Sequence, residues 1–537
     1  MLFRSEHART HDLRRVIVVI PYLSIIEQNA RDYRLIFGAD QVLEHHCAVE
    51  MDSGKSKATD ADDEPSQMLD YERAIENWDV PIVVTTSVQF IESLFAAATG
   101  RARKLHNIAR SVVIFDEVQT LPAHLLEPTL DVLRTLQKHF GVSVVFCSAT
   151  QPAFRKSGNL KQGFREDEIT EIAPRVNDLF AKLQRVSYRI VPETERWDWN
   201  RVAAEMLQRP QALCVVNLRQ HAFDLHSALQ ERLASEVGWA LLPVSRASSD
   251  QGHGETGKSA YPTKSDDDAV FHLSSAMCPA HRLDVLGLSK NPVANNIKRR
   301  LDSDNARPCW VVSTQLIEAG VDIDFPVVLR AMGPLDSIVQ AAGRCNRENR
   351  LRDASGSPTL GEVIVFRPED NTLPPGVYRT ATDITATLLS QIEADTLATD
   401  HKLFERYFDQ LYQLVPNDNN IQTERKKLHF RKVAELGRVI QNDTQPVIVP
   451  YGKGCNIIEE IRTRAVIKGQ PRFGRDDLRK LQRFMVNLHQ RDFQRLFTLK
   501  AITPLLPNLE IHVLADGWYH SDLGIVIEQH PLEDFLV

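Results

Sequence analysis

The feature that most constrains the fold is a pair of short apolar runs that each end abruptly in polar residues. The first run, Val112 to Phe115, is followed by Asp116 and Glu117. The second run, Val144 to Cys147, is followed by Ser148 to Thr150. β-branched and aromatic runs of this length are typical of strands that are buried on both faces of a parallel sheet. Because open α/β sheets bind ligands at the carboxyl ends of their strands, these polar residues mark a candidate site.

Alternating strand and helix patterns predict two parallel sheets. The runs at 16–20 and 82–84 precede the first pair, and helical periodicity separates all four strands. A second set of runs follows, at 213–217, 271–274, 309–314, 327–329 and 363–366. Past Pro374 the chain changes to charged helices. We therefore expect the α/β class with two tandem parallel-sheet domains and a mostly helical C-terminal accessory domain. The predicted boundaries are 1–155 for a partial first domain, 156–195 for a linker, 196–368 for the second domain and 369–537 for a linker and the accessory domain.

Composition narrows the class of protein. A chain of 537 residues is long enough for about three or four domains. None of its apolar runs reaches the roughly eighteen residues that span a bilayer, so we expect a cytoplasmic protein with no membrane partner. The seven cysteines form no C-x-x-C pair, which favours reduced thiols over zinc. The net charge of -7 does not exclude nucleic-acid binding, because a local basic groove is sufficient.

The acidic pair and a later arginine pair suit nucleotide hydrolysis. An Asp at the end of a strand can bind Mg²⁺, and a neighbouring Glu can deprotonate the attacking water. Arg344 and Arg347 lie one helical turn apart, and guanidinium groups can stabilise phosphate charge. Taken singly, an acidic pair is as often a helix cap, and arginines on a helix usually form a solvated face. The two features together favour a site for nucleotide hydrolysis.

The ordered set of motifs resembles superfamily 2 helicases, and more narrowly the CRISPR-associated helicase-nuclease of type I systems. The segments that carry the resemblance are Pro21 to Gln28, Thr85 to Gln89, Asp116 to Gln119, Ser148 to Thr150, Met277 to Arg282, Ser313 to Asp322 and Gln340 to Arg347. The likeness covers roughly residues 10 to 350. It implies two RecA-like domains and an ATP- and Mg²⁺-dependent motor on single-stranded DNA. It also implies recruitment by a guide-RNA surveillance complex of the Cascade type.

The resemblance implies a role for each matching residue. Asp116 would bind Mg²⁺, Glu117 would be the general base, and Arg344 and Arg347 would reach the γ-phosphate. The other nucleotide-binding positions would be Gln340, Gly343, Gly320 and Asp322. Those that couple hydrolysis to movement would be Gln119, Ser148, Ala149 and Thr150. Those that bind nucleic acid would be Pro21, Tyr22, Ser24, Gln28, Thr85, Thr86, Thr314 and Gln315. Any one of the last group, taken singly, is more simply explained as ordinary turn and cap chemistry.

The sequence departs from this family at two sites. A motor of this class needs a Gly-rich phosphate loop before the strand that ends at Pro21, and the chain has no such loop there. Gly54 to Ser56 lacks the glycine five residues earlier, and Gly252 to Ser259 follows no strand and is broken by Pro262. The doublet His11-Asp12 lacks the further ligands of a metal-dependent nuclease.

These departures predict an amino-terminally truncated helicase that works with a separate nuclease or a polypeptide bearing the phosphate loop. The lost segment should include a central strand, which would leave unpaired backbone or a gap beside the Asp116 strand. Two other functions stay open: a non-catalytic DNA- or protein-binding remnant, or another superfamily 2 motor of restriction or repair. Basic clusters at Arg425 to Lys432 and Arg472 to Arg483 are either solvated helix faces or part of a groove for a strand.

Overall fold

The computed structural model describes most of the chain as two compact units. The described residues are 2–21, 23–46, 74–152, 154–173, 175–238, 268–289, 292–302, 306–318, 321–394, 396–440, 444–467, 473–507 and 509–527. The first unit comprises Met1–Leu183, Pro334–Asp336 and Gly376–Gln441, and the second comprises Gln184–Gly333, Ser337–Pro375 and Asn442–Val537. Tyr22, Gly320 and both lookalike phosphate loops, Gly54 to Ser56 and Gly252 to Ser259, lie outside the described residues.

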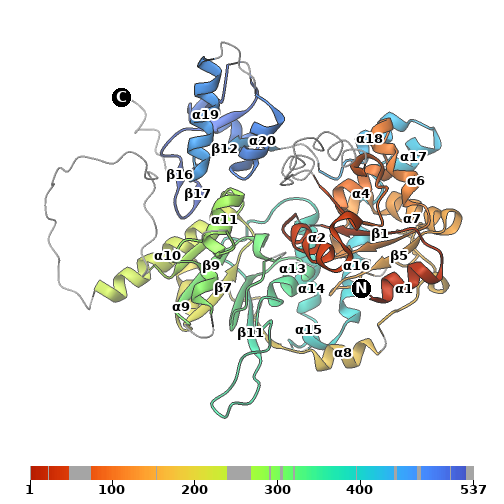
Figure 1. Ribbon diagram of the computed structural model, residues 1–537. Coiled ribbons are helices and arrows are strands. Elements are labelled where there is room, and N and C mark those ends of the chain that lie inside the picture. Colours follow the sequence, from red (N-terminus) through yellow and green to blue (C-terminus); the bar gives the residue numbers. More distant parts are fainter. Residues whose placement is uncertain are drawn as a thin grey trace. The chain divides into compact units, whose positions relative to one another are not determined.

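The first unit is built on a five-stranded parallel sheet with strand order β2-β3-β1-β4-β5 (Figure 1). Its strands are β1 (Arg15–Ile20), β2 (Val42–His45), β3 (Ile82–Thr86), β4 (Ser111–Phe115) and β5 (Ser143–Phe146). The helices between them are α1 (Leu2–Thr10), α2 (Leu23–Phe37), α4 (Ser87–Leu94), α5 (Thr99–Ala102), α6 (Lys104–Ile108) and α7 (Leu126–Phe140). β3 and β4 are buried throughout, as expected of strands covered on both faces.

The predicted gap beside the Asp116 strand was wrong. β4 pairs in parallel with β1 on one side and with β5 on the other. The edges of the sheet are instead β2 and β5, and the residues of β5 are only half-buried. The strand that leads into Ser148 therefore occupies the place where we expected the gap.

Helices from later in the chain complete the first unit. They are α8 (Val176–Lys182), α14 (Val377–Leu389), α15 (Thr396–Thr399), α16 (Lys402–Leu414), α17 (Ile421–Lys426) and α18 (Phe430–Leu436). Arg425 on α17 pairs with Asp131 on α7 at 2.6 Å, and the Glu127 N–H donates to the Asn417 carbonyl at 2.9 Å. These contacts attach part of the predicted accessory region to the first sheet.

The second unit holds a six-stranded parallel sheet with strand order β6-β11-β10-β7-β9-β8. Its strands are β6 (Val186–Ile190), β7 (Gln211–Val215), β8 (Val270–Leu273), β9 (Cys309–Ser313), β10 (Val327–Ala331) and β11 (Gly361–Phe366). Its helices are α9 (Trp199–Leu207), α10 (Arg219–Gly238), α11 (Pro279–Leu286), α12 (Ile297–Arg300) and α13 (Leu335–Ala342). The predicted linker 156–195 therefore contains a strand, β6, which pairs with β11.

The last part of the chain adds a small mixed sheet to the second unit. Its strands are β12 (Thr444–Ile448), β13 (Met485–His489), β14 (Ile502–Pro504) and β15 (His512–Leu514), and a short hairpin follows, β16 (Tyr519–His520) and β17 (Gly524–Ile525). The helices are α19 (Lys453–Ile467), α20 (Arg475–Gln482) and α21 (Gln490–Thr498). The predicted fold class, two parallel α/β sheets with a helix-rich C-terminal region, is confirmed. Among the described helices, not one is both long and apolar enough to cross a bilayer.

Candidate functional site

Four predicted site segments meet at one edge of the first sheet. Pro21 follows β1, Thr86 ends β3, Asp116 follows β4, and Ser148 comes shortly after β5. Because these strands are parallel and in register, their carboxyl ends lie at the same edge. The Asp116 N–H extends the pairing by donating to the carbonyl of Val19 at 2.9 Å.

A hydrogen-bonded chain of side chains joins the acidic pair to the serine segment. The Gln119 amide donates from Nε2 to Glu117 Oε2 at 2.6 Å. Its Oε1 accepts from the Ser148 hydroxyl at 2.6 Å. Ser148 Oγ in turn accepts from the backbone N–H of Thr150 at 2.9 Å. The amide of the buried Gln119 thus links the segments that follow β4 and β5.

The backbone at Glu117 adopts the left-handed conformation, with φ 50° and ψ 53°. For a residue with a Cβ this conformation costs roughly 1–2 kcal/mol. Neighbouring bonds hold it in place: the Val118 N–H donates to the Cys147 carbonyl at 3.1 Å, and the Thr120 hydroxyl donates to the Glu117 carbonyl at 2.7 Å. Strain of this kind concentrates at functional sites, and nothing in the sequence predicted it.

The donor set around Asp116 suits a Mg²⁺ ion that is shared with phosphates. Asp116 is half-buried at the sheet edge. The described residues contain no group of three or more His, Cys, Asp or Glu side chains that could hold a metal by themselves. Mg²⁺ typically binds one or two carboxylates together with water and substrate phosphates. Asp116 would therefore be a protein ligand to an ion that arrives with a nucleotide.

The remaining serine and threonine positions differ in what their side chains contact. The Thr86 hydroxyl caps α4 by accepting from the Gln89 N–H at 3.0 Å, and the Thr85 hydroxyl donates to the His45 carbonyl at 2.9 Å. Thr150 is fully buried, and within the described residues its hydroxyl has no hydrogen-bond partner, whereas Ala149 is exposed. Turn and cap chemistry thus accounts for Thr85 and Thr86.

On the first unit's α2, the predicted positions are only partly described. Gln28 is exposed, and the side chain of Ser24 is outside the described set, as is all of Tyr22.

In the second unit the two predicted arginines have different environments. Arg344 is buried and donates from Nε to the Ile317 carbonyl at 3.1 Å and from a terminal nitrogen to the Glu318 carbonyl at 2.7 Å. Arg347 is exposed and pairs with Asp322 at 3.4 Å. Arg344 therefore braces the turn after β9, and Arg347 is the more available cation.

The other nucleotide and nucleic-acid positions of this unit lie on neighbouring segments. Gln340 is half-buried on α13, and Gly343 is exposed just after that helix. Thr314 is buried directly after β9, and the Gln315 amide donates to the Asn217 carbonyl at 3.5 Å.

A buried ion pair that the sequence did not reveal supports the same turn. Arg330 on β10 is fully buried, and its Nε lies 3.0 Å from Glu318 Oε1. Arg330 also donates to the Asn217 side-chain oxygen at 2.7 Å. A buried charge is retained only with partners of this kind. The only available sequence signal was a single arginine in an otherwise apolar strand pattern, Val327 to Ala331.

The distinctive segment Met277 to Arg282 contacts the C-terminal hairpin of β16 and β17. The Tyr519 hydroxyl accepts from the Cys278 N–H and lies 3.0 Å from His281 Nδ1. The Ile525 N–H donates to the Ala276 carbonyl at 3.0 Å. Burial raises the pKa of the Tyr519 hydroxyl well above its ordinary value, so it stays protonated. The segment thus has a packing role within the second unit.

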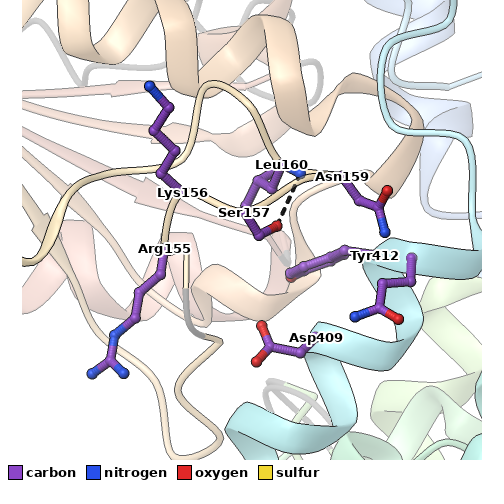
Figure 2. A pocket seen from close by; sticks show the side chains of 8 residues that line it. Arg155, Lys156, Ser157, Asn159, Leu160, Asp409 and Tyr412 are labelled. Atoms are coloured by element: carbon purple, nitrogen blue, oxygen red, sulfur yellow. Dashed lines mark hydrogen bonds between the residues drawn. The ribbon is translucent and has the colours of Figure 1, made fainter.

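One pocket of about 210 Å³ lies in the first unit, between the loop that follows the serine segment and α16. Its lining residues are Arg155, Lys156, Ser157, Asn159, Leu160, Asp409, Tyr412 and Gln413 (Figure 2). Of the two cations in this lining, Arg155 is already ion-paired, since it lies 3.3 Å from Glu166 and 3.8 Å from Glu405. None of the predicted site residues lines it.

Comparisons with known proteins point to one family. The model of the family described as "CRISPR-associated nuclease/helicase Cas3, C-terminal" matches residues 258–350. The chain is 25% identical over 493 residues to the CRISPR-associated nuclease/helicase Cas3 of Haloferax volcanii, covering 76% of this chain and 51% of the relative. It is 28% identical over 153 residues to the protein of the same name from Methanothermobacter thermautotrophicus, covering 28% of this chain and 17% of the relative.

The fold agrees with these matches. The crystal structure of T. fusca Cas3 with AMPPNP superposes with a TM-score of 0.58 at 15% identity, over 94% of this chain and 62% of that chain. In sequence and in fold the chain thus resembles the CRISPR-associated nuclease/helicases Cas3. It spans about half the length of the Haloferax volcanii Cas3. The Cas3 likeness also shows that the two parallel sheets are RecA-like domains.

Proposed function

We propose that this chain is the motor part of a CRISPR defence system, a translocase on single-stranded DNA that hydrolyses ATP with Mg²⁺ when a further segment or polypeptide supplies the phosphate-binding loop. The Cas3 relatives are named nuclease/helicases, and one structural neighbour is a CRISPR RNA-guided surveillance complex. The proposed partners are accordingly single-stranded DNA and a guide-RNA surveillance complex.

The observation that carries this proposal is the hydrogen-bonded chain from Glu117 through Gln119 to Ser148. In the proposed mechanism Asp116 binds Mg²⁺, and Glu117 accepts the proton of the attacking water. Arg347, with Arg344 and Gln340, acts on the phosphates, while Gly320, Asp322 and Gly343 shape the nucleotide site. When bound, Mg²⁺ would neutralise charge that develops on the phosphate oxygens.

Gln119 would transmit the state of Glu117 to Ser148, and the neighbouring Ala149 and Thr150 would follow. A side-chain amide suits this role because it contacts a carboxylate with one end and a hydroxyl with the other. DNA phosphates would be held, without reading bases, at eight positions in the motif segments of the two units. These positions are Pro21, Tyr22, Ser24, Gln28, Thr85, Thr86, Thr314 and Gln315.

The proposal is tested in the native host by replacing Glu117 with Gln at the chromosomal gene. Gln has the same shape but is not a base, so guide-directed loss of a target plasmid should stop while the protein level stays unchanged. Glu166→Gln, at an exposed acid of the same unit, is the matched control and should leave interference intact. Interference that survives Glu117→Gln would favour the alternative, a non-catalytic binding protein.

A second experiment concerns the 537-residue polypeptide alone. In its sequence, none of the strands of the first sheet is followed by a Gly-rich loop with the Lys and the hydroxyl that bind phosphates. We therefore expect little ATP hydrolysis, with or without single-stranded DNA. The measurement is phosphate release in the presence of Mg²⁺. Rapid, DNA-stimulated hydrolysis that Glu117→Gln abolishes would contradict this expectation while supporting the motor itself.

A further inference from the structure

The turn between α17 and α18 has a concentration of positive charge that contrasts with the chain as a whole. Residues 426–432, named here the basic tip, read Lys-Lys-Leu-His-Phe-Arg-Lys and contain no acidic residue, while the full chain has a net charge of -7. Within the described residues, Lys426 and Arg431 form no ion pair. Lys427 and Lys432 share one buried carboxylate, Glu424, at 3.1 and 3.8 Å.

Two large apolar side chains stand exposed among these cations. Leu428 is 68% exposed and Phe430 is 64% exposed. Within the described residues, the Phe430 ring contacts no other aromatic ring. The backbone at Leu428 has φ 59°, a conformation that costs a branched residue free energy. A leucine in a strained conformation and a phenylalanine thus both expose apolar surface at the tip, and strain of this kind concentrates at functional sites.

The tip is carried on a firmly attached support. Arg425, just before it, pairs with Asp131 on α7 at 2.6 Å, and Ile421 and Val433 on either side are buried. Figure 1 shows α17 and α18 next to each other in the first unit. The His429 N–H donates to the Glu424 carbonyl at 3.1 Å and closes the turn. The exposed side chains therefore project from an ordered base.

We propose that the basic tip binds single-stranded nucleic acid, with Phe430 stacking on a base and the flanking cations contacting phosphates. Cores of protein–protein interfaces are depleted in lysine, whereas single-strand binding sites combine cations along the backbone with exposed aromatic rings. An acidic protein is thus the less favoured partner. The tip lies outside the helicase motifs, and this binding needs neither ATP nor Glu117, so the inference goes beyond the proposed function and stands apart from it.

The first test places a reporter at the proposed stacking position. In the 537-residue protein with Phe430→Trp, oligothymidylate should quench the fluorescence of the new tryptophan. This fluorescence is obtained by subtracting the wild-type signal at each point of the titration. Phe140→Trp is the matched control, because Phe140 is 51% exposed at the end of α7 and should respond little. An unquenched residue 430, or equal quenching at both positions, would overturn the proposal.

The second test measures affinity without nucleotide by fluorescence anisotropy with a labelled oligothymidylate. The Lys426→Ala/Phe430→Ala pair should weaken binding by about fivefold or more, as expected for the loss of one stacked base. The Lys138→Ala/Phe140→Ala pair removes the same two residue types, both exposed, from α7 and should leave affinity close to wild type.

The salt dependence distinguishes phosphate binding from other effects. Lys426→Ala/Arg431→Ala should lower the slope of log affinity against log salt by about 0.7 for each phosphate that the variant no longer neutralises. Leu428→Gly removes an apolar side chain while relieving backbone strain, so it should weaken binding without lowering the melting temperature. Affinity and slope equal to those of the Lys138/Phe140 control would overturn the proposal and assign the tip to an acidic protein partner.

Discussion

At the scale of single residues, the amide of Gln119 has both of its ends occupied. It donates to Glu117 and accepts from Ser148, so removing it takes one hydrogen bond from each of these two side chains at a buried position. We expect Gln119→Ala to lower the free energy of unfolding of the first unit by about 1–3 kcal/mol. Urea unfolding of Gln119→Ala, Ser148→Ala and the double variant measures this. Strictly additive effects would show that the two side chains are not coupled.

A second residue, Asp477, makes the C-terminal region sensitive to acid. Burial alone would raise the pKa of the Asp477 carboxyl, but hydrogen bonds from Arg464 at 2.6 Å and the Gly474 N–H at 3.0 Å more than offset this, and the pKa lies below its ordinary value. The lowered pKa stabilises the folded state at pH values above about 3.9, which is the pKa of Asp in an unfolded chain. This stabilisation is lost as the pH falls through the lower pKa of the folded state.

Asp477→Asn should therefore destabilise the protein near neutral pH and flatten the loss of stability below about pH 4. Thermal unfolding followed between neutral pH and about pH 3 measures both effects. The neighbouring Asp476, with 83% of its side chain exposed, supplies the control. If Asp476→Asn changes the pH profile as much as Asp477→Asn does, the burial of Asp477 is not the cause.

The sequence predicted the position of site residues better than their conformation. Asp116 and Ser148 could be placed at one sheet edge because each follows an apolar run, and parallel strands end on the same side. The left-handed backbone of Glu117 depends on contacts with the neighbouring strand, so no local pattern encodes it. The burial of Arg344 and its bonds to carbonyls across the turn depend in the same way on tertiary structure.

At the scale of elements, a glycine allows the hairpin of β16 and β17 to pack closely against the backbone at the start of the Met277 to Arg282 segment. Gly524 has φ 82°, and a Cβ there would lie 2.4 Å from the Ala276 carbonyl oxygen. Gly524→Ala should therefore cost the strain of a positive φ and, in addition, displace β17. Gly517 has φ 87° but open space around it, so Gly517→Ala should cost only the strain, about 1 kcal/mol.

Chemical unfolding of the two variants measures the difference, and limited proteolysis of the C-terminal region reports on the hairpin. Similar losses of stability in both variants would show that the close approach to Ala276 is not a constraint.

The strands that were predicted differ in composition from those that were missed. β1, β3, β4 and β9 are runs of β-branched and apolar residues, and the sequence pattern alone identified them. β2 carries Glu44 and His45 at buried positions, and β6 alternates apolar with polar residues at the edge of its sheet. These strands form because they pair with other strands of the sheet, which their own sequence does not reveal. The short strands of the C-terminal sheet depend on pairing with each other in the same way.

At the scale of the whole molecule, residues 376–441 belong with the first unit although they follow the second sheet in the sequence. Asp131 on α7 binds both Arg425 and Gln422 on α17, at 2.6 and 3.1 Å. Asp131→Ala should therefore speed amide hydrogen exchange in α17 and leave α19, in the second unit, unchanged. Exchange measured by mass spectrometry on peptides from the two helices tests this. Faster exchange in α19 as well would contradict the grouping.

The interleaved course of the chain has a consequence for how such a protein can be divided. Each unit is assembled from separated stretches of sequence, and neither is contained in a continuous segment from one end. A gene that encoded only the first or only the last portion of these residues would leave both units without some of their packing partners. A fusion at one junction therefore cannot exchange either unit for a homologous one, because each exchange would need several junctions.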